Sequence, residues 1–164
     1  MRAGRVILAV LLAAAVLQIL YYYPQLPSTV ASHFGSGGRP NGWSTKEGFF
    51  GIYLGVLALF LLTFGGLPVL FRRISPVWIN LPNKDYWLAP ERRDYTVTTL
   101  RSEMLWFGNA TIAFMIAVFE LAIRANLVES PRLSEPAMWF LLAGYLVYTV
   151  LWLVQFYRRF ARPR

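Results

Sequence analysis

The sequence has no cysteine, a single histidine and few charged side chains. Only 15% of its 164 residues are Asp, Glu, Lys or Arg, against roughly 25% in an ordinary soluble domain. The lack of cysteine excludes a disulfide-stapled scaffold, an iron–sulfur protein and a cysteine-based zinc ribbon. The sequence also contains no phosphate-binding loop, no HExxH motif and no nucleophile–histidine–acid grouping. These absences favour a protein that is not an enzyme and carries no cofactor, and an enzymatic role stays an alternative.

Apolar residues dominate what is present. They make up 57% of the chain, aromatic residues make up 16%, and the mean hydropathy is +0.46, which excludes a disordered chain. The only formal charge inside the long apolar runs is Glu120, and runs of about 20 residues suffice to cross a bilayer as helices. We therefore predict an all-α integral membrane protein, a single domain over 1–164, with four transmembrane helices at about 6–23, 49–71, 104–123 and 137–157.

The basic residues predict the orientation of these helices. If both termini are cytoplasmic, twelve of the 16 Lys and Arg residues lie inside, as the positive-inside rule requires. We expect a multi-pass protein of the cytoplasmic (inner) membrane, and no nucleic-acid binding, because no groove-reading motif accompanies the charge. The first apolar run resembles a signal peptide but continues through Tyr23, which favours an uncleaved anchor.

The outer loop 24–48 has strong local signals. Ser28 starts an expected short helix with apolar residues at helical spacing, and the Gly-rich run at 35–38 ends it. Arg39-Pro40-Asn41-Gly42 predicts a β-turn. Ser44 and Glu47 have the spacing of a capping box, which would start the second transmembrane helix. We therefore expect a structured outer loop rather than a flexible tether.

The inner loop between the second and third apolar runs is the longest. Pro90 and Glu91 predict a helix start, and no Gly or Pro follows until Gly108. The third helix is therefore expected from about residue 90 to Arg124, as a cytoplasmic helical extension of the membrane span. Charged and aromatic residues near its start form a candidate inner cluster, read either as a solvated paired surface or as a docking site for anionic lipid or a partner: Lys84, Asp85, Trp87, Glu91, Arg92 and Arg93.

The outer loop carries the pattern LPxxVxxHFxxxGxPNGWxxK between Leu26 and Lys46. This pattern resembles a bacterial and archaeal membrane domain of unknown function that also forms the N-terminal part of SdpI-like peptide-toxin immunity proteins. The inner string from Leu81 to Trp87 is similar to stand-alone members of the same family. The resemblance covers about 1–100, with two further spans over 101–164, and it implies a role in immunity or signalling.

Seven outer-loop residues are the candidate contacts to a ligand or partner: His33, Phe34, Arg39, Asn41, Trp43, Lys46 and Glu47. His33 has three open interpretations, as a structural residue that knits the loop together, a proton or ligand contact, or a metal ligand. We assign no metal site, because one chain offers too few ligands around it.

Three polar residues lie in or beside the spans, namely Asn109, Glu120 and Arg124. Glu120 and Arg124 have the favourable i,i+4 order for an ion pair, and Glu120 could instead contact the outer loop. Asn109, with Gln18 and Gln155, is expected to form interhelical hydrogen bonds. Gly51 and Gly55 form a small-residue stripe that permits close packing within the chain or in an oligomer.

The leading hypothesis is a small membrane binding or accessory protein whose outer loop recognises a ligand. The partners expected are the bilayer itself and a peptide, a lipid or another membrane protein. One alternative is a membrane enzyme or small transporter that uses His33, Glu47 and Glu120, which would have to converge. Another is a structural subunit of a membrane complex.

Overall fold

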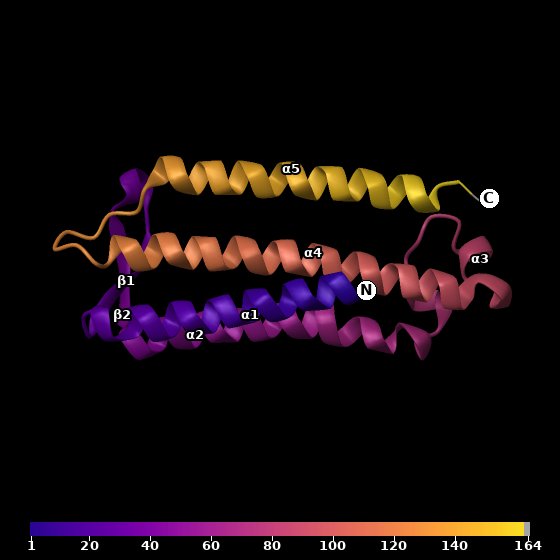
Figure 1. Ribbon diagram of the computed structural model, residues 1–164. Helices are drawn as coiled ribbons and strands as arrows, with labels where there is room; N and C mark the ends of the chain where they lie inside the picture. Colours follow the sequence, from indigo (N-terminus) through magenta and orange to yellow (C-terminus); the bar gives the residue numbers. More distant parts are fainter. Residues whose placement is uncertain (163–164) are drawn as a thin grey trace.

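Four long helices run side by side in the computed structural model, which describes residues 1–162 (Figure 1). Four helical segments, which contain the predicted spans, are long and apolar enough to cross a membrane: Arg2–Gln25, Lys46–Arg72, Pro90–Ala125 and Glu135–Phe160. The start of the third helix at Pro90 is confirmed, and Arg164, one of the predicted inner cations, lies outside the described residues. The long α-helices in these segments are α1 (Arg2–Tyr22), α2 (Lys46–Phe60), α4 (Pro90–Ala125) and α5 (Glu135–Phe160).

The second apolar segment is not one continuous α-helix. After α2 the chain forms a π-helical stretch over Leu61–Gly66 and a 3₁₀ stretch over Leu67–Arg72. Pro68 supplies no backbone N–H and Gly65 and Gly66 are weak helix formers, so the α-helical hydrogen-bond pattern is interrupted here. The distorted stretch packs closely on α4, since a Cβ added at Gly108 would lie 2.3 Å from Cβ of Phe64.

The segment between α1 and α2 is a β-hairpin, not the short helix expected after Ser28. Strand β1 (Thr29–Phe34) pairs antiparallel with β2 (Pro40–Thr45), so the fold is mostly helical rather than all-α. The turn is made by Gly35–Arg39, where Gly35 N–H donates to the Arg39 carbonyl at 2.8 Å. The turn predicted over 39–42 is therefore wrong, because those residues belong largely to β2.

The start of α2 also differs by one residue from the predicted capping box. Thr45, not Ser44, is the N-cap, and its Oγ1 accepts from Gly48 N–H at 3.1 Å. Glu47 lies in the first turn of α2, where a carboxylate is favourable at the positive end of the helix dipole.

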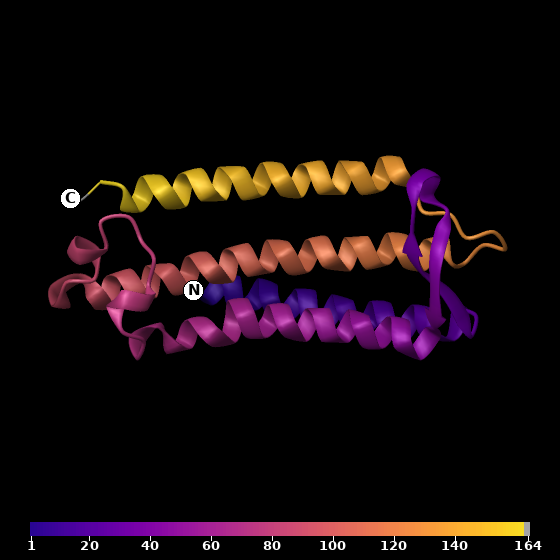
Figure 2. The same ribbon diagram turned by 180° about the vertical axis from the view of Figure 1, so that it is seen from behind.

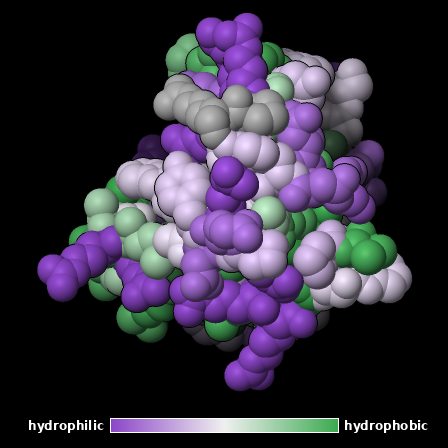
Figure 3. Space-filling model, turned by 90° about the vertical axis from the view of Figure 1, so that its right-hand side faces the viewer, coloured by the Kyte–Doolittle hydropathy of each residue, from purple (hydrophilic) through white to green (hydrophobic). Residues whose placement is uncertain are grey.

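The hairpin crosses one end of the bundle, from α1 and α2 towards the start of α5 (Figures 1 and 2). We call this end the hairpin end. The opposite end, the α3 end, holds the short helix α3 (Lys84–Trp87), the start of α4 and the end of α5. Hydrophilic side chains gather over the α3 end (Figure 3).

Each end of the bundle contains one buried apolar cluster. The first lies between α1, α2, β1 and α4, with Val30, Tyr53 and Ile123 fully buried. The second joins the 73–89 segment to α4 and α5 around Trp87, Leu100 and Phe160. Helix α5 packs on α4 through aromatic pairs such as Phe114–Tyr145, with ring centroids 4.5 Å apart.

Candidate functional site

The hairpin is fastened to α4 by the side chain of Asn126. Its Oδ1 accepts from Ala31 N–H at 2.7 Å, and its Nδ2 donates to the Ala31 carbonyl at 2.9 Å. The amide therefore uses both backbone groups of Ala31 on the edge of β1 that faces away from β2, as a neighbouring strand would. Asn126 and Ala31 are both buried, so these bonds form out of water.

The turn of the hairpin is fastened to the α4–α5 connection. Leu133 N–H donates to the Gly38 carbonyl at 2.9 Å. Gly37 N–H donates to Glu135 Oε1 at 2.6 Å, and Arg132 Nε donates to the Gly37 carbonyl at 3.0 Å. The hairpin is thus held at its base by α1 and α2, in its middle by α4 and at its turn by the start of α5.

The side of the hairpin left exposed carries His33, Asn41 and Trp43. His33 Nδ1 and Asn41 Oδ1 form a hydrogen bond across the two strands, and Trp43 is 55% exposed. Arg39 is also exposed beside the turn, whereas Phe34 is half-buried. Four of the seven predicted contact residues therefore present polar or aromatic groups to the surroundings from a fixed backbone.

Lys46 and Glu47 are instead engaged within the chain. Lys46 Nζ donates to the Leu26 carbonyl at 3.3 Å and lies 4.5 Å from the centroid of the Tyr23 ring. The Tyr23 hydroxyl donates to Glu47 Oε1 at 3.1 Å. These contacts connect the end of α1 to the start of α2, which gives Lys46 and Glu47 a role in closing the base of the hairpin.

Beneath the hairpin, Glu120 is the centre of a polar cluster between α1, α2 and α4. Its carboxylate accepts from Gln18 Nε2 and from the Tyr22 hydroxyl, both at 2.7 Å, and from Arg124 Nε at 2.6 Å. Gln18 Oε1 in turn accepts from the hydroxyl of buried Tyr53 at 2.6 Å. The i,i+4 ion pair with Arg124 is present, and the other two partners described, Gln18 and Tyr22, come from α1 rather than from the loop.

The three residues of the enzyme or transporter alternative belong to three separate hydrogen-bonded groups. His33 bonds to Asn41, Glu47 to Tyr23, and Glu120 to the cluster below. A shared proton or ion would need direct contacts among them. In residues 1–162, no group of three His, Asp or Glu side chains is placed to hold a metal ion.

Asn109 and the glycine stripe lie elsewhere in the bundle. Asn109 is buried on α4, and its Nδ2 donates to the Gly4 carbonyl on α1 at 2.8 Å, which is the interhelical bond expected. Its Oδ1 has no hydrogen-bond partner among residues 1–162. Added Cβ atoms at Gly51 and Gly55 would meet nothing within 4 Å, so these glycines do not serve packing within the chain.

Three of the six members of the inner cluster make contacts within the chain. The indole N–H of buried Trp87 donates to the Phe160 carbonyl at 2.8 Å, and Arg93 donates to the Ile74 carbonyl at 2.7 Å. The Arg92 guanidinium lies 4.0 Å from the centroid of the Tyr86 ring. The remaining members of the predicted cluster are exposed at the surface: Lys84, Asp85 and Glu91.

Sequence reasoning missed Asn126 and Tyr53. An asparagine directly after a long helix is an ordinary signal for a helix end, so nothing marked Asn126 as a partner for a distant strand. Tyr53 lies within an apolar run. A buried tyrosine hydroxyl usually needs a hydrogen-bond partner, and this need is the one sequence signal that could have indicated its contact with another helix.

Comparison with known proteins finds a similarity for only part of the chain. No curated protein and no solved structure matches the chain. The match to a family model ends within α2, so it leaves out the inner loop and the last two helices. The segment at residues 9–57, which contains α1 from residue 9 onward, the hairpin and the first part of α2, matches a family described as domain of unknown function DUF1648.

Proposed function

We propose that this chain is a binding or accessory protein of the cytoplasmic membrane, and that its hairpin presents a fixed recognition surface on the outer face. The recognition surface consists of His33, Arg39, Asn41 and Trp43. The single observation that carries the proposal is that the hairpin is fastened at three places while these four side chains stay exposed. A surface that is ordered before binding loses less conformational entropy when a ligand binds.

Two features support the outward placement of the hairpin. The basic residues are concentrated in the segments at the α3 end and near the two termini, which the positive-inside rule places in the cytoplasm. Trp43 and the tyrosines that end α1 lie at the hairpin end, as is typical of aromatic residues at a membrane–water interface.

The chemistry of the recognition surface favours a peptide or a protein segment as the ligand. Exposed tryptophan and arginine side chains are enriched at protein interfaces, and the His33–Asn41 pair offers further hydrogen-bonding groups. The resemblance to SdpI-like immunity proteins is consistent with this ligand class, and in that version of the proposal the role is immunity or signalling.

Site-specific photo-crosslinking in native membranes tests the proposal. A benzophenone amino acid replaces Trp43 in one chain and Val128 in another. Val128 is 56% exposed in the α4–α5 connection, at the same end of the bundle but outside the recognition surface. We expect a discrete crosslinked product from position 43 that position 128 does not give.

The second arm combines the position-43 crosslinker with His33→Ala or Asn41→Ala. Both side chains are exposed, so these variants should fold, which their thermal unfolding in detergent verifies. We expect the crosslinked product to weaken in both. Equal products from positions 43 and 128, or a product indifferent to both alanine variants, would show that the hairpin is only structural.

A further inference from the structure

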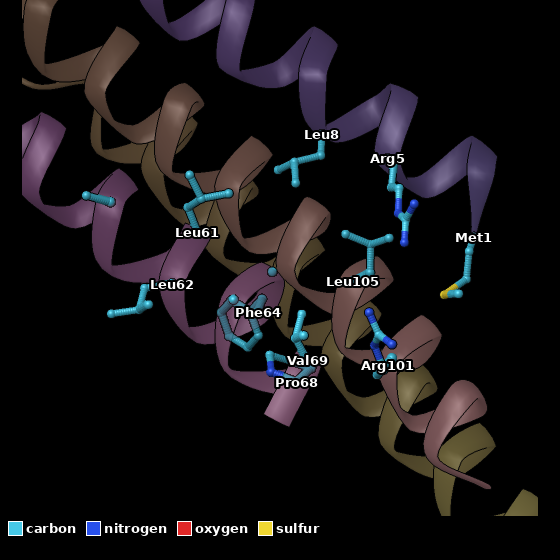
Figure 4. Close-up of a pocket in the computed structure, with 13 residues that line it drawn as sticks. Met1, Arg5, Leu8, Leu61, Leu62, Phe64, Pro68, Val69, Arg101 and Leu105 are labelled. Atoms are coloured by element: carbon cyan, nitrogen blue, oxygen red, sulfur yellow. The ribbon is translucent and has the colours of Figure 1, made fainter. Parts of the chain in front are cut away.

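A cavity of about 520 Å³ opens near the α3 end, between α1, α4 and the distorted stretch after α2. Most of its lining is apolar, including Leu8, Leu61, Phe64 and Leu105 (Figure 4). It lies in the half of the bundle away from the hairpin and shares no residue with the recognition surface.

The shape of this cavity follows from the irregular backbone after α2. The π-helical stretch over Leu61–Gly66 is wider than an α-helix and the 3₁₀ stretch over Leu67–Arg72 is tighter, and Pro68 lies in the cavity wall. Phe64 lines the cavity and packs directly on Gly108 of α4, so its position in the cavity wall is fixed. Ala58, one turn earlier on α2, is exposed and small and leaves the side of the cavity open.

Two cations border the cavity from two different helices. Arg5 of α1 and Arg101 of α4 extend towards the same opening on either side of Leu105 (Figure 4). The lining contains no Asp or Glu. Within residues 1–162, the salt bridges involve neither Arg5 nor Arg101, and the nearest acid along α4, Glu103, pairs with Arg159.

We propose that this cavity binds one anionic phospholipid, with an acyl chain against the apolar wall and the phosphate between Arg5 and Arg101. Guanidinium groups bind phosphate oxygens through paired N–H donors, which suits two arginines that lack an acidic partner. An apolar wall beside two cations is complementary to a lipid with an anionic head and an apolar tail. The proposal requires the helices to lie in a bilayer, and it does not depend on what the hairpin binds.

Lipid binding to the purified full-length chain tests this proposal. The chain in a non-ionic detergent is titrated with phosphatidylglycerol, with phosphatidylcholine of identical acyl chains, and with inorganic phosphate, and bound lipid is counted by native mass spectrometry. We expect one phosphatidylglycerol per chain, weaker binding of phosphatidylcholine, and no displacement by inorganic phosphate. Arg5→Gln and Arg101→Gln should each weaken phosphatidylglycerol binding roughly fivefold.

Two further variants distinguish a specific lipid-binding site from non-specific attraction of anionic lipid to the basic surface. Arg158→Gln removes an exposed cation from α5 at the same end of the molecule and should leave binding unchanged. Ala58→Trp fills the opening without altering charge and, because Ala58 is exposed, should not disturb folding; it should weaken binding as much as the arginine variants. Equal binding of the two lipids, an equal effect of Arg158→Gln, or no effect of Ala58→Trp would overturn the proposal.

Discussion

At the scale of single residues, Asn126 and Gly108 fix contacts between segments far apart in the sequence. Asn126 binds both backbone groups of buried Ala31, while Gly108 allows Phe64 to approach α4. One position acts through hydrogen bonds and the other through the absence of a side chain. Their loss should therefore destabilise the fold for different reasons.

Replacing Asn126 with alanine should leave the N–H and C=O of Ala31 buried without partners. An unsatisfied buried polar group costs about 1–3 kcal/mol, so we expect Asn126→Ala to lower the free energy of unfolding by roughly 2 kcal/mol or more. Asn41→Ala is the control, since it removes an amide from an exposed hydrogen bond and should cost less than about 1 kcal/mol. Chemical unfolding in detergent measures both, and equal losses would contradict the assigned role of Asn126.

Alanine at Gly108 should force α4 and the stretch after α2 apart, because its Cβ would lie 2.3 Å from Cβ of Phe64. Overpacking of this kind costs about 1–3 kcal/mol. Gly144→Ala on α5 is the matched control, since its Cβ would meet nothing within 4 Å, and it should be neutral or slightly stabilising. Thermal unfolding of the two variants gives the comparison, and the same midpoint for both would argue against close packing at Gly108.

At the scale of elements, the long helices could be predicted and the hairpin could not. Apolar runs of bilayer length and the Pro90 start signal define the helices locally. Val30 and Ala31, by contrast, are short apolar neighbours that fit a helix or a strand, and distant Asn126 decides between the two. The Pro40-Asn41-Gly42 signal is a good turn sequence, but contacts of Gly37 and Gly38 with the α4–α5 connection place the turn earlier.

The candidate site likewise contains local contacts that the sequence predicts and tertiary contacts that it does not. The Glu120–Arg124 pair could be predicted because both residues lie on one helix at a fixed spacing. The contacts of Glu120 with Gln18 and Tyr22 depend on the rotation of α1 against α4, which no local pattern defines. The contacts of Lys46 with Leu26 and of Glu47 with Tyr23 likewise depend on tertiary structure. The sequence alone therefore does not show that these two side chains are engaged within the chain.

Two neighbouring glycines in the hairpin turn allow the cost of backbone strain to be measured separately from the cost of a steric clash. Gly37 and Gly38 both have positive φ, at 74° and 66°, but only the Cβ of an alanine at position 38 would meet another atom, the Leu133 carbonyl oxygen at 2.1 Å. We expect Gly38→Ala to cost about 1 kcal/mol more than Gly37→Ala and to speed hydrogen exchange at Leu133 N–H. If both variants exchange equally at Leu133, the turn is not seated on the α4–α5 connection.

At the scale of the whole molecule, the two ends of the bundle are built differently. The hairpin end combines an apolar cluster with polar contacts to α4 and α5, whereas the α3 end combines aromatic packing with hydrogen bonds to the last turn of α5. The proposed recognition surface lies at the hairpin end, and the proposed lipid cavity lies in the other half of the bundle. Each can therefore be altered without changing the other.

The proposed orientation places Trp43 outside the cell and Lys84 inside it. Because the chain has no cysteine, a single introduced cysteine is the only site for a membrane-impermeant maleimide. We expect Trp43→Cys to be labelled in intact cells and Lys84→Cys only after permeabilisation; both positions are exposed. Ala15→Cys, at a position 2% exposed, is the unlabelled control, and the reverse labelling pattern would invert the orientation.

The attachment of the hairpin to late parts of the chain has a consequence for biogenesis. The ribosome produces the hairpin well before Asn126, Leu133 and Glu135, which hold its middle and its turn. Before Asn126 is made, the N–H and C=O of Ala31 have no protein partner, so a partial chain leaves this strand edge accessible to proteases and to other strands. Only the end of α4 and the start of α5 cover that edge, so the hairpin becomes fully attached only after the chain has been made as far as Glu135.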